Sequence, residues 1–300
     1  MSEYVQIEGK KYLYKSKYRD DDSLRKSFNR LANNIFDIDF ERWYQEGYWG
    51  DGYIPYSLID NNEIISNVSV SIMEFNFKGK KKLYIQIGTV MTDSRYRHRG
   101  LGRYLMERVI DEWKDRCDLI YLFANDSAIK FYPKFNFVET YEYQHSRSCL
   151  NISNNSDVRK IDMNYKKDKE LFKRIIENTR VFSKFAVLNN KNLIMFYCNS
   201  FMQDNIYYIK DYDAIVIAEM SKEIIYILEV FGTKDIDLES IINKIVTKNT
   251  RRVVLGFTPL NTVLYDEKVL REEDTTLFIM RGKENPLELY NMMFPVLSHT

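Results

Sequence analysis

The chain contains 300 residues, of which 44 are Lys or Arg and 43 are Asp or Glu, so its formal net charge is +1. This near-neutral charge argues against a general nucleic-acid-binding protein, and no apolar run approaches the ~20 residues that a membrane-spanning helix needs. Hydrophobic residues make up 45% of the chain, enough for a large core, and the length is typical of two domains.

The first residues lack the charged-then-apolar order of a signal peptide, which predicts a cytoplasmic protein. The three cysteines, Cys117, Cys149 and Cys198, have no C-x-x-C spacing and are expected to be reduced thiols. Neither the cysteines nor the three histidines have the spacing of a metal site, so no metal is expected.

The first half of the chain alternates strand-like and helix-like patterns. Residues 11–19 predict a strand, and Asp22 and Ser23 then begin a helix whose apolar residues recur at helical spacing. Further along, the pattern predicts a helix at 40–49, strands at 53–59, 64–77 and 83–92, a helix at 101–113, a strand at 118–124, and one more helix and strand. This order predicts an α/β (α+β) fold with a mixed central sheet flanked by helices.

The most informative stretch joins the strand at 83–92 to the helix at 101–113. Gly100 and Gly102 leave the backbone N–H groups accessible, and four arginines add positive charge: Arg95, Arg97, Arg99 and Arg103. Such a turn at a helix N-terminus predicts a pyrophosphate site. The stretch is neither a P-loop nor a dinucleotide fingerprint, because it lacks G-x-x-x-x-G-K-[ST] and has Leu105 where a third glycine would stand.

Two motifs together resemble those of the GNAT superfamily of N-acetyltransferases. Arg97-x-x-Gly-x-Gly102 is similar to the acyl-CoA pyrophosphate loop, [Arg/Gln]-x-x-Gly-x-[Gly/Ala]. The segment 125–137 is similar to the signature Asn-x-x-Ala-x-x-x-Tyr-x-x-x-Gly-Phe, with Asn136 in place of glycine. The segments 40–47, 53–56 and 85–92 also resemble those of a bacterial group of two-part GNAT proteins.

The resemblance implies acetyl-CoA as cosubstrate. The pantetheine arm is expected along the backbone of one strand, the pyrophosphate on the amides of the loop, and Asn125 on the pantetheine. The implied cofactor-binding residues are Val90, Met91, Thr92, Arg97, His98, Arg99, Gly100, Leu101, Gly102, Arg103 and Asn125. An alternative for Asn125 is that it only caps the following helix.

For catalysis, the resemblance places Tyr132 as the general acid that protonates the leaving thiolate; a packing aromatic is the alternative. The base is open, because the strand at 84–92 carries no carboxylate and Gln86 cannot take a proton. One candidate is Glu74. The other is the terminal carboxylate of Thr300, as in certain multi-domain relatives, since residues 291–300 are uncharged and apolar.

The chain is predicted to divide into a GNAT domain at 1–150 and a second domain at 151–300, joined by a polar linker at 151–157. The pattern of 207–257 echoes that of 53–123, but residues 231–235 replace the arginine and glycine loop. We interpret the second half as a degenerate GNAT-like copy that shapes the acceptor cleft; an unrelated α+β domain is the alternative.

The acceptor site is expected at an aromatic-rich stretch, although aromatics at such spacing also suit a core: Trp43, Tyr44, Tyr48, Trp49, Tyr53 and Tyr56. The predicted activity is direct acetyl transfer from acetyl-CoA to a primary amine of a small molecule. The alternatives are a protein lysine or N-terminal acetyltransferase and a non-catalytic acyl-CoA-binding regulator. A homodimer is left open, and neither nucleic acid nor a membrane is expected as a partner.

Overall fold

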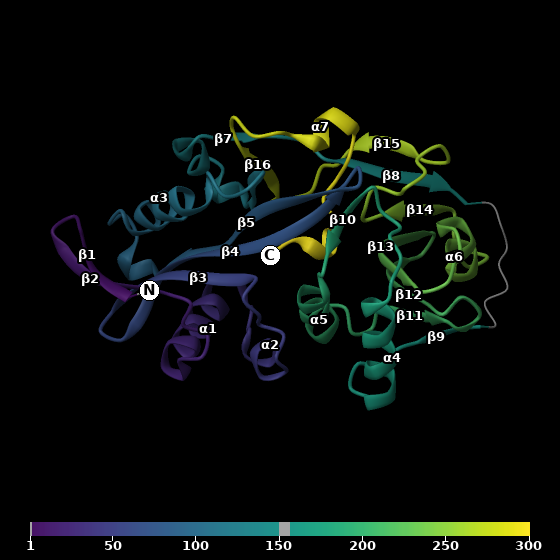
Figure 1. Cartoon of the computed structure of the whole chain (residues 1–300), viewed down its shortest axis with the longest axis horizontal. Helices are drawn as coiled ribbons and strands as arrows, with labels where there is room; N and C mark the ends of the chain where they lie inside the picture. Colours follow the sequence, from purple (N-terminus) through teal and green to yellow (C-terminus); the bar gives the residue numbers. More distant parts are fainter. Residues whose placement is uncertain (1, 150–156) are drawn as a thin grey trace.

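The computed structural model describes residues 2–149 and 157–300, so nearly all of the predicted linker lies outside the described residues. Two twisted sheets lie side by side in it, each with helices packed against it (Figure 1). The strands of the first sheet are β1 (Ser2–Ile7), β2 (Lys10–Ser16), β3 (Tyr53–Asp60), β4 (Glu63–Phe77), β5 (Lys80–Thr92), β6 (Leu119–Ala124), β16 (Thr276–Met280), β7 (Phe137–Glu139) and, paired with β4, β10 (Phe185–Leu188).

The second sheet is built from the rest of the strands. In spatial order they are β15 (Asp266–Val269), β8 (Tyr143–Ser148), β14 (Arg252–Leu255), β13 (Ile224–Gly232), β12 (Ala214–Ser221), β11 (Ile206–Ile209) and β9 (Val158–Lys160). The helices are α1 (Asp22–Phe36), α2 (Glu41–Gln45), α3 (Leu101–Trp113), α4 (Lys166–Glu177), α5 (Lys191–Ser200), α6 (Leu238–Ile245) and α7 (Pro286–Tyr290), with short 3₁₀ turns at Ser94–Tyr96, Asp126–Ala128, Tyr132–Phe135, Lys210–Tyr212 and Val296–Ser298. Within the described ranges, none of these helices is long and apolar enough to cross a membrane.

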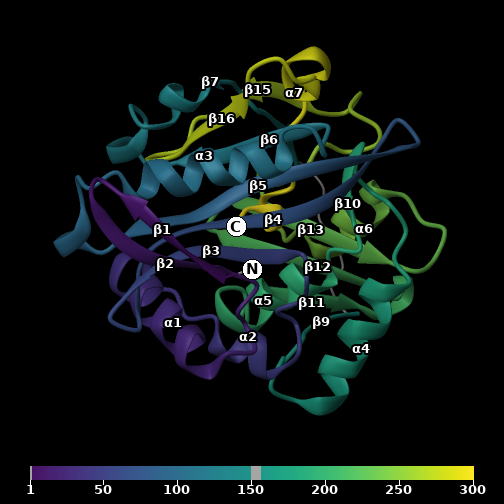
Figure 2. The ribbon, with the colours of Figure 1, turned by 60° about the vertical axis from the view of Figure 1, so that its left-hand side comes forward.

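Helices α1 and α3 cover opposite faces of the first sheet (Figure 2). The side chain of Asp21 accepts a hydrogen bond from Leu24 N and begins α1, whose buried residues Leu24, Phe28 and Leu31 then form one stripe. Burial of each such side chain is worth about 1.5–3 kcal/mol. On the other face, α3 buries Leu101, Leu105, Met106 and Val109.

The two halves of the chain exchange strands. Strand β16, from near the C-terminus, lies between β6 and β7 in the first sheet, while β8, from the first half, lies between β14 and β15 in the second. The spatial orders β2-β3-β4-β5-β6-β16-β7 and β9-β11-β12-β13-β14-β8-β15 therefore match strand for strand. The tandem arrangement with a second GNAT-like copy is confirmed. Most strands of each sheet lie on one side of the boundary predicted at residue 150. The exceptions are β10 and β16, which join the first sheet from the second half, and β8, which joins the second sheet from the first half.

The pairing of the strands is a second similarity that supports the duplication. In each copy the strand that follows a long hairpin pairs antiparallel with one neighbour and parallel with the next: β5 with β4 and β6, and β13 with β12 and β14. A register shift interrupts each antiparallel pair, at 67–69 in the first copy and at 217–218 in the second. The predicted helix after Asn125 is instead two 3₁₀ turns, because Pro133 interrupts a longer helix.

Candidate active site

A bulge in β5 opens the site. Asn67 on β4 pairs with Met91, but Ser69 pairs with Gly88, so two residues of β5 lie opposite one of β4. Thr89 at the bulge has φ +48°, a strained angle for a β-branched residue. The buried Asn67 side chain holds it there by donating to the Thr89 carbonyl oxygen at 2.9 Å. The polar residues Ser66, Asn67 and Ser69 inside an otherwise apolar stretch are the signal that could have identified Asn67 from the sequence.

Beyond the bulge, β5 separates from β6. Their parallel pairing extends only from Tyr84–Leu119 to Gln86–Tyr121 within the described residues. A groove of about 860 Å³ opens there, lined by residues 87–92 of β5, by the turn after β5, and by segment 123–134. The predicted cofactor residues Val90, Met91 and Thr92 lie along it, as do all the predicted loop residues except Arg99.

The loop after β5 ends in an uncapped helix N-terminus. His98 (φ +62°) and Gly100 (φ +68°) adopt left-handed backbone angles, and α3 begins at Leu101 with no side-chain hydrogen bond from its cap, Gly100. The first-turn N–H groups of Leu101, Gly102 and Arg103 have no partner one turn earlier in the helix, so they can bind an anion. Arg97 and Arg103 line the groove beside them.

The corresponding helix of the second copy is blocked. Helix α6 begins after Asp237, whose carboxylate accepts from Ser240 N at 2.8 Å and from Ser240 Oγ at 2.7 Å. A built-in anion thus occupies the position that the first copy leaves open. This accounts physically for the degenerate loop predicted at 231–235.

Three predicted basic or polar residues differ in their surroundings. The Arg95 guanidinium pairs with Asp93 at 2.7 Å and is 74% exposed, outside the groove. Arg99 also lies outside the groove and donates to the Arg95 carbonyl oxygen. Asn125 lines the groove and makes no capping bond; its Nδ2 instead donates to Asp274 Oδ2 at 2.9 Å. The second half of the chain therefore orients a groove residue, which sequence reasoning missed.

Tyr132 lies in the wall of the groove with only 5% of its surface exposed. Burial raises the pKa of its hydroxyl to about 12, so it stays protonated at neutral pH. Its ring packs on Phe131, Phe137 and Phe278. The structure therefore brings Tyr132 to the cofactor groove within an aromatic cluster.

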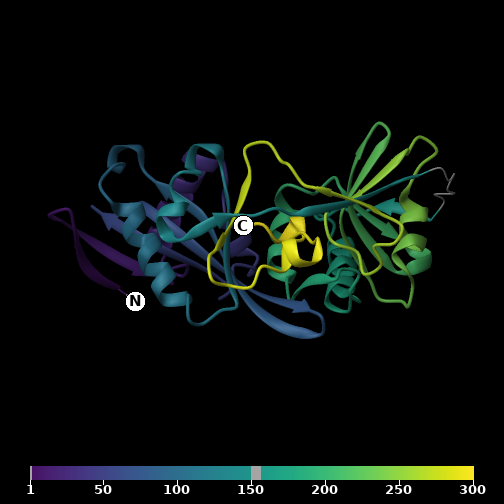
Figure 3. The same cartoon turned by 90° about the horizontal axis from the view of Figure 1, so that it is seen from above.

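The C-terminal segment runs between the two sheets (Figure 3). The Phe294 ring stacks on Tyr121 at 4.0 Å between centroids, and the Phe294 N–H donates to an oxygen of the buried Glu142 carboxyl group at 2.7 Å. Farther along the chain, the Val296 N–H donates to the Gly256 carbonyl oxygen. The Val296 side chain packs beside the bulge of β13. The C-terminal segment therefore packs against the second copy beside β13 before it reaches the first copy.

The segment ends in the first copy. Thr300 lines the groove and lies against Gly88: a Cβ built on Gly88 would be 2.3 Å from the Thr300 carbonyl oxygen. The Gln86 side-chain amide is oriented so that both its nitrogen and its oxygen have hydrogen-bond partners. The nitrogen donates to the Ser298 carbonyl oxygen at 2.8 Å, and the oxygen accepts from Thr300 N at 2.9 Å. Glu74, the other predicted base, is exposed beside Lys81 and lines neither this groove nor the cavity next to it.

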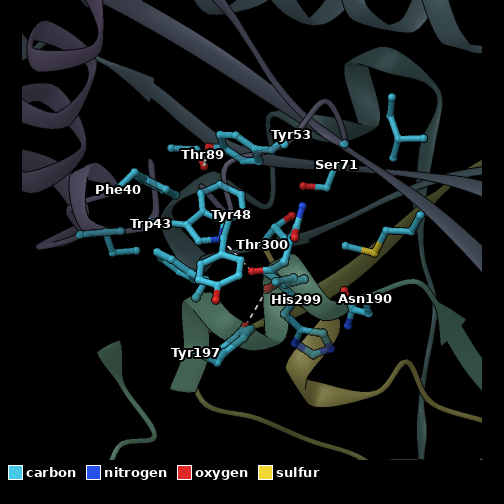
Figure 4. Close-up of a pocket in the computed structure, with 18 of the residues that line it drawn as sticks. Phe40, Trp43, Tyr48, Tyr53, Ser71, Thr89, Asn190, Tyr197, His299 and Thr300 are labelled. Carbon is cyan, nitrogen blue, oxygen red and sulfur yellow. Dashed lines mark hydrogen bonds between the residues drawn. The ribbon is translucent and has the colours of Figure 1, made fainter. Parts of the chain in front are cut away.

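An aromatic cavity of about 400 Å³ adjoins the groove (Figure 4). The two spaces share Ile38, Thr89, Phe123 and Thr300. Of the predicted acceptor aromatics, Trp43, Tyr48 and Tyr53 line the cavity, whereas Tyr44, Trp49 and Tyr56 do not. Helix α5, which the sequence did not predict, adds Phe196 and Tyr197 to the wall. Among the described residues, no group of three or more His, Cys, Asp and Glu side chains could hold a metal ion.

Comparison with known proteins finds a family that matches part of the chain. The model of the Acetyltransferase (GNAT) family matches residues 21–137. A protein of Melanoplus sanguinipes entomopoxvirus, described as "Putative glycylpeptide N-tetradecanoyltransferase", is 22% identical over 191 residues, which cover 64% of this chain. The match covers 55% of that protein, so the chain spans about half the length of this curated relative.

Solved structures agree on the fold. A conserved protein from Enterococcus faecalis, described as "Probable N-Acyltransferase", superposes with a TM-score of 0.58 at 16% identity, over 89% of this chain and 71% of the other. A GCN5-related N-acetyltransferase from Kribbella flavida gives 0.54 at 14% identity, over 89% and 71%. Residues 21–137 therefore match the acetyltransferase (GNAT) family, and the chain shares its fold with these solved structures.

Proposed function

We propose that this protein is an acetyl-CoA-dependent N-acetyltransferase that acts on the primary amine of a small molecule. The observation that supports this best is the meeting of two spaces, the groove beside β5 and the aromatic cavity, at Thr89, Phe123 and Thr300. A thioester held in the groove would face an amine held in the cavity across this junction.

Acetyl-CoA would bind along the groove. Its pantetheine arm would pair with the backbone of 88–92, which β6 does not reach. Its diphosphate would accept hydrogen bonds from the first-turn N–H groups of α3, with Arg97 and Arg103 adding charge. Asn125 would offer its free amide oxygen to the pantetheine while Asp274 holds its nitrogen.

The reaction would be direct transfer. The amine nitrogen attacks the thioester carbonyl carbon, a C–N bond forms, and the carbonyl oxygen takes up the negative charge. A β5 backbone N–H near Met91 would stabilise that oxyanion. The C–S bond then breaks, and the CoA thiolate takes the proton of the Tyr132 hydroxyl, which burial keeps protonated. The proton lost by the amine passes to a base and returns to Tyr132 through solvent.

For the base we propose the carboxyl group of Thr300, the last residue of the sequence. Thr300 lines both spaces, and the hydrogen bonds of the Gln86 amide to the backbone of Ser298 and Thr300 hold the end of the segment there. Glu74 does not suit this role, because its carboxylate lies beside Lys81 and lines neither of the two spaces. Intact-mass measurement of the purified protein, followed by kinetics after addition of one glycine beyond Thr300, tests this role: the extended protein should lose turnover and keep CoA affinity.

The function itself is tested by thiol release. Purified protein and acetyl-CoA are mixed with a panel of small primary amines, a lysine-containing peptide and a glycine-initial peptide. Amine-dependent release of CoA, with an acetamide product 42 Da heavier than the amine by simple mass balance (roughly the mass of C₂H₂O), supports the proposal. Release with the peptides alone would support a protein acetyltransferase. CoA binding without release from any acceptor would support a non-catalytic regulator.

A further inference from the structure

The aromatic cavity has an unusual lining for a site that receives an amine. Eight of its side chains are Phe, Tyr or Trp rings drawn from both halves of the chain: Phe40, Trp43, Tyr48, Tyr53, Phe123, Phe196, Tyr197 and Phe201. Its polar side chains are uncharged amides and hydroxyls such as Ser71, Thr89 and Asn190. Among the described residues that line it, none carries an Asp, Glu, Lys or Arg side chain.

The one imidazole in the lining is neutral. Burial lowers the pKa of His299 to about 3, and its ring stacks on Phe123 at 3.9 Å between centroids. The hydroxyl of Tyr197 donates to the His299 carbonyl oxygen at 2.6 Å, and burial raises its pKa. The described walls of the cavity therefore present π-faces and neutral dipoles to an occupant.

The rings are fixed in place by mutual packing. Phe40 stacks on Phe196 at 5.3 Å and on Tyr53 at 5.6 Å between centroids, so the residue before α2 packs with α5 and β3 into one wall. The Trp43 indole N–H donates to the Asn192 carbonyl oxygen at 2.7 Å, and the Tyr53 hydroxyl bonds to Thr89 Oγ1 at 2.8 Å. These rings have their polar atoms satisfied and offer apolar faces to an occupant.

We infer that this cavity selects an arylalkylamine, a single primary amine on a flat apolar body, and rejects amines that carry a second cation. The inference rests on the proposed function. The planar body would stack among the rings while its amine reaches the junction at Thr89 and Thr300. A second ammonium group would lose its water without an anion to replace it, which is costly.

A long acyl chain is the rival occupant. The cavity's volume and apolar rings would accept one, but its wall also carries hydroxyl and amide groups that an acyl chain cannot bond: Ser71, Thr89, Asn189, Asn190 and Asn192. Polar groups interspersed with rings suit a planar amine better than a hydrocarbon tail. We therefore assign the cavity to the acceptor, and the acyl chain becomes an outcome of the test.

The test is calorimetric titration of 2-phenylethylamine, ethylamine and putrescine into protein saturated with CoA. We expect 2-phenylethylamine to bind at least about tenfold more tightly than ethylamine, because a ring is buried, and putrescine to bind more weakly than 2-phenylethylamine. Putrescine binding as tight as that of 2-phenylethylamine, or equal binding of the two monoamines, would overturn the inference. The inference would also be overturned if octanoyl-CoA displaced 2-phenylethylamine and were turned over faster than acetyl-CoA.

Two pairs of variants locate the binding. Phe201→Ala, at a ring that is 52% exposed, should weaken 2-phenylethylamine binding several-fold, while Tyr165→Ala, at a 53% exposed ring outside the cavity, should not. Ser71→Asp should raise the affinity for putrescine relative to 2-phenylethylamine, and Ser71→Asn should not. Unchanged ratios in both pairs would contradict the assignment.

Failure of the inference and failure of the proposed function give different results. Selective binding of 2-phenylethylamine without CoA release would refute the acetyltransferase and leave the cavity assignment intact. Acetyl transfer that prefers putrescine would support the acetyltransferase and overturn the cavity assignment.

Discussion

Thr300 lies so close to Gly88 that a residue with a side chain does not fit at position 88 unless Thr300 moves. A Cβ on Gly88 would be 2.3 Å from the Thr300 carbonyl oxygen and 2.8 Å from its carbonyl carbon. The two residues are far apart in the sequence, yet both line the groove where β5 leaves β6. Gly88 is therefore required for the space it leaves open.

This contact predicts the effect of Gly88→Ala. The added methyl group must displace Thr300, so we expect kcat to fall at least about tenfold, a loss of 1.4 kcal/mol or more. Deletion of Thr300 should give a similar loss, and the double variant should lose little more, because both changes remove the same group. Steady-state kinetics with acetyl-CoA check this. Multiplied losses, or full activity of Gly88→Ala, would show that Thr300 does not act at this position.

Tyr132→Phe tests the proposed acid. Loss of the hydroxyl should lower kcat about 100-fold or more and leave the dissociation constant of acetyl-CoA nearly unchanged, because the ring still fills its place among Phe131, Phe137 and Phe278. Rapid-mixing kinetics and direct binding provide the two numbers. If kcat is retained, the residue is only a packing aromatic.

Asn67→Ala tests how the bulge is held. The change removes the bonds from Asn67 Nδ2 to the Thr89 carbonyl oxygen and to Ser69 Oγ, both at 2.9 Å, and leaves buried partners unsatisfied. We expect the free energy of unfolding to fall by about 2–3 kcal/mol, measured in urea. The half-exposed Asn76 on the same strand is the matched control, and its alanine variant should lose less than about 1 kcal/mol. Equal losses would mean that Asn67 has no special role at the bulge.

Glu142 should make stability depend on pH. Burial raises the pKa of this carboxyl group to about 8 from its ordinary value of 4.5, so the folded protein holds a proton there that the unfolded chain has released. The free energy of unfolding should therefore fall as pH rises from about 4.5 through 8. Glu142→Gln, which can still accept from Phe294 N, should be more stable than the parent at pH 8.5 and nearly equal at about pH 4.5. Thermal unfolding at both pH values checks this; a parallel decline in both proteins would contradict it.

Much of the fold follows from local patterns in the sequence. The stripe of α1, the strands β3 to β6 and the glycine turn before α3 lie within a few residues of their predicted bounds. The strand exchange does not follow from such patterns, because β8 and β16 pair with partners more than a hundred residues away. Nothing local in a short strand specifies which sheet it will join.

The candidate site divides in the same way. Most of the predicted groove residues lie in or beside the two motifs that resemble those of the GNAT family, so that resemblance predicted them. The cavity wall combines α2 with α5 and the tail, and that convergence depends on how the two copies pack. Asp274 on Asn125 and Glu142 on Phe294 are likewise long-range bonds. Tyr44, Trp49 and Tyr56 show the limit of composition alone, since they are aromatic neighbours of the cavity that do not line it.

The account depends on acyl-CoA binding at the open helix end of the first copy, and calorimetric titration of CoA into matched Gly102 variants tests this most directly. Gly102→Ala should bind CoA nearly as the parent does, because a Cβ there meets only ordinary contacts at 3.7 and 3.8 Å. Gly102→Asp should fold normally, since a carboxylate suits a helix N-terminus, but should weaken CoA binding at least about tenfold by occupying the anion site, as Asp237 does in the second copy. No heat with the parent protein, or equal CoA affinity in Gly102→Asp, would contradict the account.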